Sequence, residues 1–350
     1  KPRRVGFPPL DGTDRPATSI DRFVSAKLAK VGLRLAHPAD PATLIRRAQL
    51  DLVGLPPEPT EIERFVGDRS ADAYQRLLDR LLASPHFGER WGRHWMDAVG
   101  YSEIRGADFD AVLNRNGDYM SGMWRYRQYV IKSHNRDKPF TRFITEQLAG
   151  DELLDWRNAD PHSEQVNELL VATRFLRMAV DLTWDPPDNS AFTRFRVLHQ
   201  TVATVAGNLL GLSLKCARCH SHKFDPVPQR DYYRLAATFK GALDEHDWLK
   251  PNGDAGSGRY LSVLPESILA KWKTESAAIV AQVDQLRKEL AEKRKKRSSE
   301  LGVAPGELEK KDADFKKAVD SANERIKELE KKKPEKPLVR ALWDLSLIHI

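Results

Sequence analysis

The chain has 350 residues, of which 41% are hydrophobic and 31% charged, and its formal net charge is +7. This length leaves room for two domains of ordinary size, and the lack of any long apolar run excludes a membrane-spanning helix. The positive charge does not indicate nucleic-acid binding. Residues 266–333 contain 18 basic and 14 acidic residues with both signs alternating, which is typical of a solvated helical face.

Helical patterns follow one another from residue 17 onward, and no segment alternates convincingly with the period of a strand. The first predicted helix has Ser19 as its N-cap. Its apolar residues fall on one stripe: Ile20, Phe23, Val24, Leu28 and Val31. We therefore predict a mainly α protein, with a multi-helical domain that carries a Cys-x-x-Cys-His turn.

The next helix has recognisable start and stop signals. Asp40 precedes Pro41, which suits the first turn of a helix, and Gly54 with Pro56 ends the pattern. Further helical patterns continue in the same way up to residue 245.

Two later segments have coiled-coil spacing, with apolar residues that step by three and four. They are Ile279, Val283, Leu286 and Leu290, and then Phe315, Val319, Ala322, Ile326 and Leu329. Because Pro305 and Gly306 form a turn signal between them, we predict an antiparallel helical hairpin. A continuous dimeric coiled coil is the alternative.

Composition divides the chain into six regions. The predicted boundaries are 1–16 for a linker from a missing upstream module, 17–245 for a helical domain, 246–263 for a Gly/Asp-rich loop, 264–333 for the coiled-coil hairpin, 334–344 for the start of a truncated downstream module, and 345–350 for an adapter-derived artefact.

The chain has only two cysteines, Cys216 and Cys219, and His220 follows the second. Chance gives this arrangement about once in 6,000 such chains. Covalent haem attachment needs two thiols on one face, as residues three apart on a helical turn provide, and a histidine beside them as the proximal iron ligand. Asp225, or the carbonyl of Pro226, is a candidate acceptor for the proton on the other imidazole nitrogen of His220, although a turn or capping role is the favoured interpretation of Asp225.

Three other uses of the cysteines stay open. A thioredoxin-like dithiol normally follows a strand, and no βαβ pattern precedes this motif. A zinc knuckle would use Cys216, Cys219, His220 and His222, which crowds four ligands into seven residues. A disulfide between the two cysteines would close a very small, strained loop.

Several segments around this motif resemble a known family in order along the chain. They include "LIRRAQLDLVGLPPEPTEIERFV", "YQRLLDRLLASPHFGERWGRHWMD", "NRDKPFTRFITEQLAGDELL" and "GLSLKCARCHSHKFDPVPQRDYYRLAATFKG". Over about residues 17–245 the chain resembles the planctomycete cytochrome c-like domain family, a group of exported proteins otherwise labelled as a domain of unknown function.

The resemblance implies export to the periplasm or beyond, and one covalent haem c on Cys216, Cys219 and His220. We expect electron transfer with neighbouring cytochrome or redox modules of the same or another chain, with neither nucleic acid nor an integral membrane segment involved. Two alternatives remain. One is a haem-dependent oxidoreductase that acts on an extracellular substrate such as a polysaccharide. The other is a structural or scaffold domain whose Cys/His cluster holds zinc or nothing.

A haem iron also needs a sixth ligand or an open position. The weak candidates are Met178, His199 and His94, each of which also suits a packed structural role. His222 is too close in sequence to reach the other haem face. An open sixth position would favour ligand chemistry over electron transfer.

Carboxylates near histidine offer acid–base chemistry. The candidates are Glu146, Asp151, and Asp97 with His94. A structural role is the expected alternative, because Arg90 and Arg93 lie nearby in the sequence and carboxylates of this kind form ion pairs. Standard hydrolase and nucleotide-binding motifs are missing from the sequence.

Overall fold

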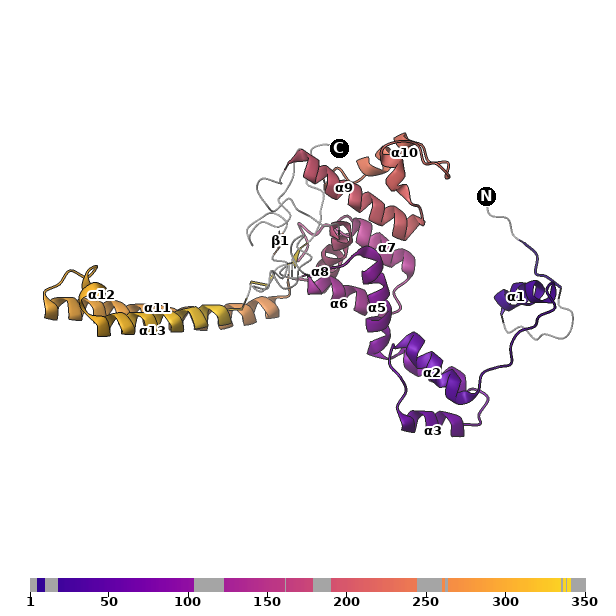
Figure 1. The fold of residues 1–350 in the computed structure, drawn as a ribbon, viewed down its shortest axis with the longest axis horizontal. Helices are drawn as coiled ribbons and strands as arrows, with labels where there is room; N and C mark the ends of the chain where they lie inside the picture. Colours follow the sequence, from indigo (N-terminus) through magenta and orange to yellow (C-terminus); the bar gives the residue numbers. More distant parts are fainter. Residues whose placement is uncertain are drawn as a thin grey trace. The chain divides into compact units, whose positions relative to one another are not determined.

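The structure is a computed structural model that describes residues 5–9, 18–103, 123–160, 162–178, 190–243, 260–261, 264–334, 336–337 and 339–340 (Figure 1). Within these residues the chain is mainly helical, as predicted. It divides into two compact units, Lys1–Phe87 and Gly88–Ile350. Most of the predicted 246–263 loop and the whole 345–350 segment lie outside the described residues.

The first unit contains a small helical core. Its helices are α1 (Ser19–Ala29), α2 (Pro41–Leu52), α3 (Pro59–Gly67) and α4 (Ala73–Leu82), and α5 (Pro85–Val99) begins at its end. Ile45, Leu77 and Leu81 are buried together between α2 and α4. Burial of such side chains stabilises the unit by about 1.5–3 kcal/mol each.

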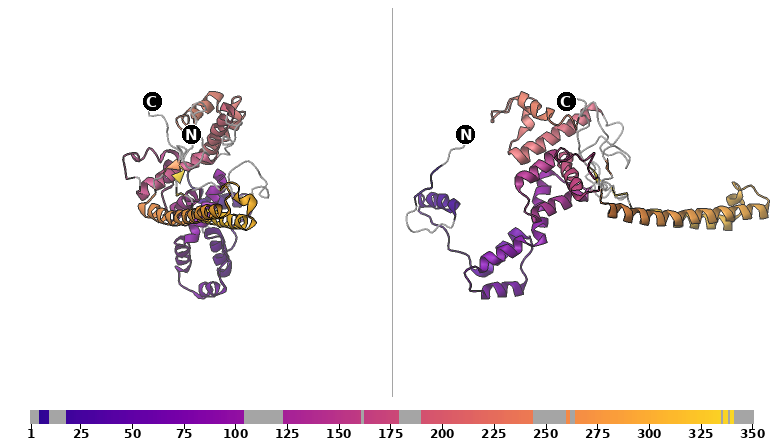
Figure 2. Two further views of the ribbon diagram at one scale, coloured as in Figure 1. Left: turned by 90° about the vertical axis from the view of Figure 1, so that its left-hand side faces the viewer. Right: turned by 180° about the vertical axis from the view of Figure 1, so that it is seen from behind.

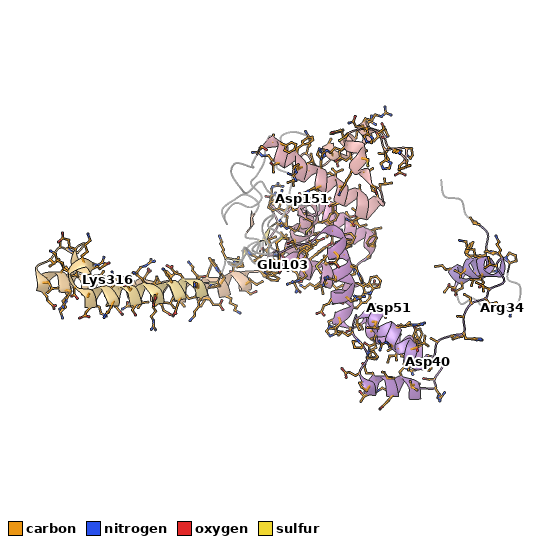
Figure 3. The ribbon with its side chains drawn as sticks, viewed as in Figure 1. Arg34, Asp40, Asp51, Glu103, Asp151 and Lys316 are labelled. Atoms are coloured by element: carbon orange, nitrogen blue, oxygen red, sulfur yellow. The ribbon has the colours of Figure 1, made fainter. Side chains whose placement is uncertain are left out.

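The ends of α2 are those predicted from the sequence. The Asp40 carboxylate accepts a hydrogen bond from the Thr43 backbone N–H at 2.9 Å, and Pro41 occupies the first turn (Figure 3). At the other end, Gly54 has φ 73°, a left-handed conformation that glycine adopts without strain.

The start of α1 differs from the prediction by one residue. Thr18, not Ser19, is the N-cap: its Oγ1 accepts from the Asp21 backbone N–H at 3.2 Å, and the Asp21 carboxylate accepts from the Thr18 N–H at 2.8 Å. The reason is the third residue of the helix. Counted from Thr18 it is Asp21, which can return the bond, whereas counted from Ser19 it is Arg22, which cannot.

The second unit holds the main core. Besides most of α5, its helices are α6 (Trp124–Asn135), α7 (Phe140–Ala149), α8 (Glu164–Ala172), the 3₁₀ turn η1 (Thr173–Arg177), α9 (Ala191–Val205), the π-turn η2 (Ala206–Leu210), the 3₁₀ turn η3 (Leu214–Arg218) and α10 (Gln229–Ala237). Glycine lets α5 approach α6 closely, because a Cβ on Gly88 would lie 2.4 Å from the Ile131 carbonyl oxygen. Phe175, Leu170, Val202 and Tyr232 are almost fully buried in this core.

A helical hairpin follows, as predicted. It consists of α11 (Glu266–Leu301), the short α12 (Leu308–Lys311) and α13 (Ala313–Lys332), and α11 and α13 lie side by side (Figures 1 and 2). Ion pairs join Arg297 to Asp312 at 2.7 Å and Arg287 to Glu330 at 3.0 Å. The two ion pairs are nested in the sequence, because Arg287 precedes Arg297 whereas its partner Glu330 follows Asp312. This nesting is the pattern of antiparallel helices.

Two short strands, one before the hairpin in the sequence and one after it, form an antiparallel pair. In it β1 (Tyr260–Leu261) pairs with β2 (Val339–Arg340), Tyr260 opposite Arg340. None of the helices that the structure describes combines the length and the apolar character required to cross a bilayer.

Candidate functional site

The Cys-x-x-Cys-His segment begins where the long α9 breaks. After the π-turn η2, Gly211 adopts φ 65° and the Leu212 N–H donates to the Ala206 carbonyl at 3.0 Å. The chain then enters the 3₁₀ turn η3, where Leu214 and Ala217 are buried. These two residues, three apart, fix which side of the turn faces the core.

The two cysteines lie on the exposed side of this turn. Cys216 and Cys219 are also three residues apart, a spacing at which side chains of a 3₁₀ turn eclipse one another. Both are exposed free thiols. The Cys219 N–H donates to the Cys216 carbonyl at 3.3 Å. The turn thus carries two exposed thiols, and the structure forms no disulfide between them.

His220 is exposed, and its tautomer follows from one contact. Its Nδ1 lies 2.8 Å from the Ser221 carbonyl oxygen. A carbonyl oxygen only accepts hydrogen bonds, so Nδ1 carries the proton and Nε2 keeps the lone pair that can bind a metal. The acceptor is thus neither of the two candidates, Asp225 and the Pro226 carbonyl. The Ser221 carbonyl belongs to the next residue in the sequence, so the ring reaches it without a change in the direction of the chain.

The loop after His220 is organised by His222. Its side chain is only 8% exposed, and its Nδ1 accepts from the Asp225 backbone N–H at 2.9 Å. Its own N–H donates to the Val227 carbonyl at 2.8 Å. Asp225 therefore acts as a turn residue, and its carboxylate lies 3.2 Å from His222 Nδ1.

A zinc knuckle needs its four side chains gathered around one point. Across the described ranges, no group of three or more His, Cys, Asp or Glu side chains is arranged to hold a metal ion. The Nδ1 lone pair of His222 instead accepts hydrogen bonds from backbone N–H groups of its own loop.

Two side chains of α10 donate hydrogen bonds to the backbone of the cysteine turn. The Arg218 carbonyl, which lies between the two cysteines in sequence, accepts hydrogen bonds from Gln229 Nε2 at 3.1 Å and from the Tyr233 hydroxyl at 3.0 Å. No motif in the sequence marks either residue as functional. The available signal was their spacing: residues four apart just after Pro228 share one face of a new helix.

Tyr232 on α10 and His199 on α9 form a buried pair between these two helices. The Tyr232 hydroxyl lies 2.6 Å from His199 Nδ1. Burial raises the pKa of Tyr232 to about 12, with the Arg218 cation acting in the opposite direction and Tyr233 and Cys219 adding to the rise. The Tyr232 hydroxyl therefore stays neutral, and it lies within electrostatic range of the cysteine turn.

The three predicted sixth-ligand candidates have different surroundings. Met178 is buried in the main core at the end of η1. His199 is buried on α9, and its ring contacts Phe195, Tyr232 and Tyr233. His94 is exposed on α5, edge-on to Trp91 at 5.6 Å between ring centroids. Through Tyr233, His199 is connected to the Arg218 carbonyl.

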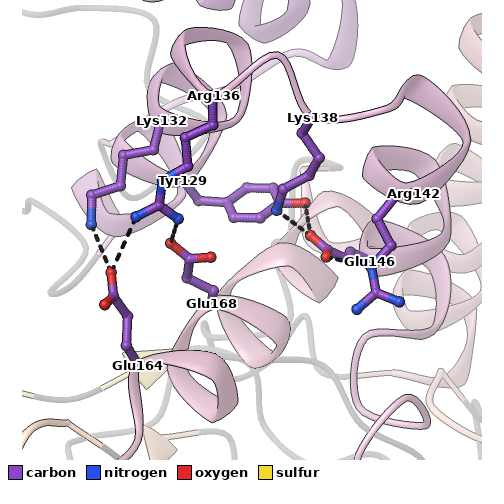
Figure 4. A network of polar contacts seen from close by, with 8 residues as sticks. All are labelled: Tyr129, Lys132, Arg136, Lys138, Arg142, Glu146, Glu164 and Glu168. Atoms are coloured by element: carbon purple, nitrogen blue, oxygen red, sulfur yellow. Dashed lines mark hydrogen bonds and ion pairs between the residues drawn. The ribbon is translucent and has the colours of Figure 1, made fainter.

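Two of the acid–base candidates, Glu146 and Asp97, form ion pairs. Glu146 is buried and accepts from Lys138 Nζ at 2.5 Å, Arg142 Nε at 2.8 Å and the Tyr129 hydroxyl at 2.8 Å (Figure 4). Burial by itself raises the pKa of Glu146, but these three donors outweigh it and lower the pKa below the usual range.

The Tyr129 hydroxyl shares this network, and burial next to the Glu146 charge raises the pKa of Tyr129. Asp97 pairs with Arg93 at 3.2 Å on the surface. Both arrangements match the structural alternative, in which these carboxylates hold cations rather than transfer protons.

Comparison with known proteins gives one match. The chain matches the profile of PSCyt2, described as a protein of unknown function (DUF1549), over residues 19–244. No curated protein and no solved structure matches the chain significantly. The matched region covers more than half of the chain and includes the cysteine turn and α10. The chain therefore belongs to the PSCyt2 family (DUF1549).

Proposed function

We propose that this protein binds one c-type haem covalently through Cys216 and Cys219, with His220 as the proximal iron ligand. The observation that carries the proposal is the state of these three side chains. Both thiols are exposed and free on one turn, and the His220 Nδ1–H is committed to a carbonyl, which leaves Nε2 for iron.

The residues present fit this group chemically. Each thiol would add its S–H across one vinyl group of the porphyrin, so a thioether forms and no atom is lost. The His220 imidazole is neutral when its Nε2 binds a metal, and its Nδ1 donor holds the ring in one orientation. The bound haem would supply one-electron transfer.

The role that follows is electron transfer outside the cytoplasm, with neighbouring redox modules as partners. It rests on the resemblance described above and on the chemistry of the turn. A haem-dependent oxidoreductase needs an open sixth position, so it differs from this proposal in one measurable property, the binding of carbon monoxide or peroxide by the reduced or oxidised iron.

The test uses the full chain, expressed in a periplasm with the haem-maturation machinery. We expect a c-type absorption band that persists after denaturation and removal of free haem. His220→Ala should keep the covalent haem but alter its axial-ligand spectrum, whereas His37→Ala, at an exposed histidine of the first unit, should change neither. A folded, colourless parent would contradict the proposal.

A further inference from the structure

The turn that carries the cysteines ends because side chains from another helix occupy its last carbonyl. In a continuing α-helix, the Arg218 carbonyl would accept from the His222 N–H. Here the His222 N–H donates to Val227 instead, at 2.8 Å. Gln229 and Tyr233 supply the two donors that the Arg218 carbonyl receives.

The helix that carries these two donors packs into the main core. Tyr232 and Ala236, on the adjoining face of α10, are 1% and 3% exposed and lie in the main core. The Tyr233 ring lies edge-on to Tyr232 at 5.3 Å and to His199 at 6.2 Å. Helix α10 is therefore anchored in the core, whereas the bonds at the end of the turn are long: the Cys216 carbonyl accepts from the Cys219 N–H at 3.3 Å and from the His220 N–H at 3.5 Å.

We propose that Gln229 and Tyr233 are positioning residues for the haem site, which act as a shared cap on the Arg218 carbonyl. That carbonyl belongs to the peptide group whose nitrogen is Cys219 N. When the plane of this peptide group is fixed, the backbone position of Cys219 is fixed and, one residue later, so is that of His220. The inference rests on the proposed function, but its structural part concerns this chain alone.

The first measurement is hydrogen–deuterium exchange on the full chain without haem. Each neutral hydrogen bond contributes roughly a fivefold factor to an equilibrium. In Gln229→Ala/Tyr233→Phe we therefore expect amide exchange in residues 219–227 to rise about tenfold or more. Exchange in α6 and α7 should stay unchanged, which shows that the variant still folds.

A matched control removes the same chemical groups elsewhere. Tyr74→Phe/Gln75→Ala lies on α4 in the first unit, where Tyr74 is 42% exposed and Gln75 donates a hydrogen bond to Asp79 on its own helix. This variant should leave exchange in residues 219–227 as in the parent. Unchanged exchange in the α10 variant would overturn the inference.

The second measurement uses the haem-loaded chain. We expect the α10 variant to lose His220 from iron, as seen in the absorption spectrum, at a lower guanidinium concentration than the parent or the control, while the loss of helix content shifts no more than in the control. Equal spectral midpoints would overturn the positioning role only. A parent that takes up no haem would overturn both the role and the proposed function.

Discussion

Glu146 and the Cys216–His220 turn are both concentrations of polar side chains, but their atoms are used in opposite ways. The Glu146 carboxylate is buried, and three neighbouring donors occupy its oxygens. In the turn, hydrogen bonds hold the backbone, while both thiols and the imidazole are exposed. A buried group whose bonds are complete stabilises the fold, whereas exposed reactive atoms on a held backbone can bind a ligand.

The largest effect is expected at Glu146. Glu146→Ala leaves Lys138, whose side chain is 14% exposed, without its carboxylate. Removing one partner of a buried ion pair costs about 3–5 kcal/mol. Urea unfolding followed by tryptophan fluorescence should show a loss of this size. Asp97→Ala is the control, since its exposed pair with Arg93 contributes under about 1 kcal/mol. Equal losses in the two variants would break the comparison.

Acid should act through the same carboxylate. The folded-state pKa of Glu146 lies below its ordinary value of 4.5. Its contribution to stability is therefore complete above about pH 4.5 and is lost as the pH falls through the lower folded value. The parent should lose more unfolding free energy than Glu146→Gln over this acid range. Parallel stability curves would show that Glu146 is not held by its three donors.

A smaller difference is expected between the two neighbouring histidines. His222→Ala leaves the Asp225 N–H without its acceptor, which costs about 1–3 kcal/mol when such a group stays shielded from water. His220→Ala removes an exposed ring and should change stability by less than about 0.5 kcal/mol. Thermal unfolding of both variants without haem measures this. The reverse order would mean that His220, not His222, holds the loop.

Much of the helical framework follows from local sequence signals. Asp40, Pro41 and Gly54 mark α2 because caps and left-handed glycines act within one turn. The hairpin follows from the spacing of three and four between apolar residues such as Phe315 and Val319. Both of these residues are buried within the hairpin. The N-cap of α1 was wrong by one position, because the choice depends on a reciprocal bond three residues later.

The contacts that complete the two polar sites could not be predicted in this way. Glu146 takes a hydrogen bond from Tyr129, 17 residues earlier, and the Arg218 carbonyl takes one from Tyr233, 15 residues later. Such pairs depend on how helices pack, which no local pattern encodes. The motif located the turn, but only the fold shows which atoms are held and which stay exposed.

The most direct measurement is the intact mass of the full chain after expression with the haem-maturation machinery, beside Cys216→Ala/Cys219→Ala. We predict that the parent gains the mass of one haem, retained after denaturation, and that the variant folds with the same helix content and gains none. A parent without added mass, or a variant that still carries covalent haem, would contradict the assignment of the exposed turn as a haem site.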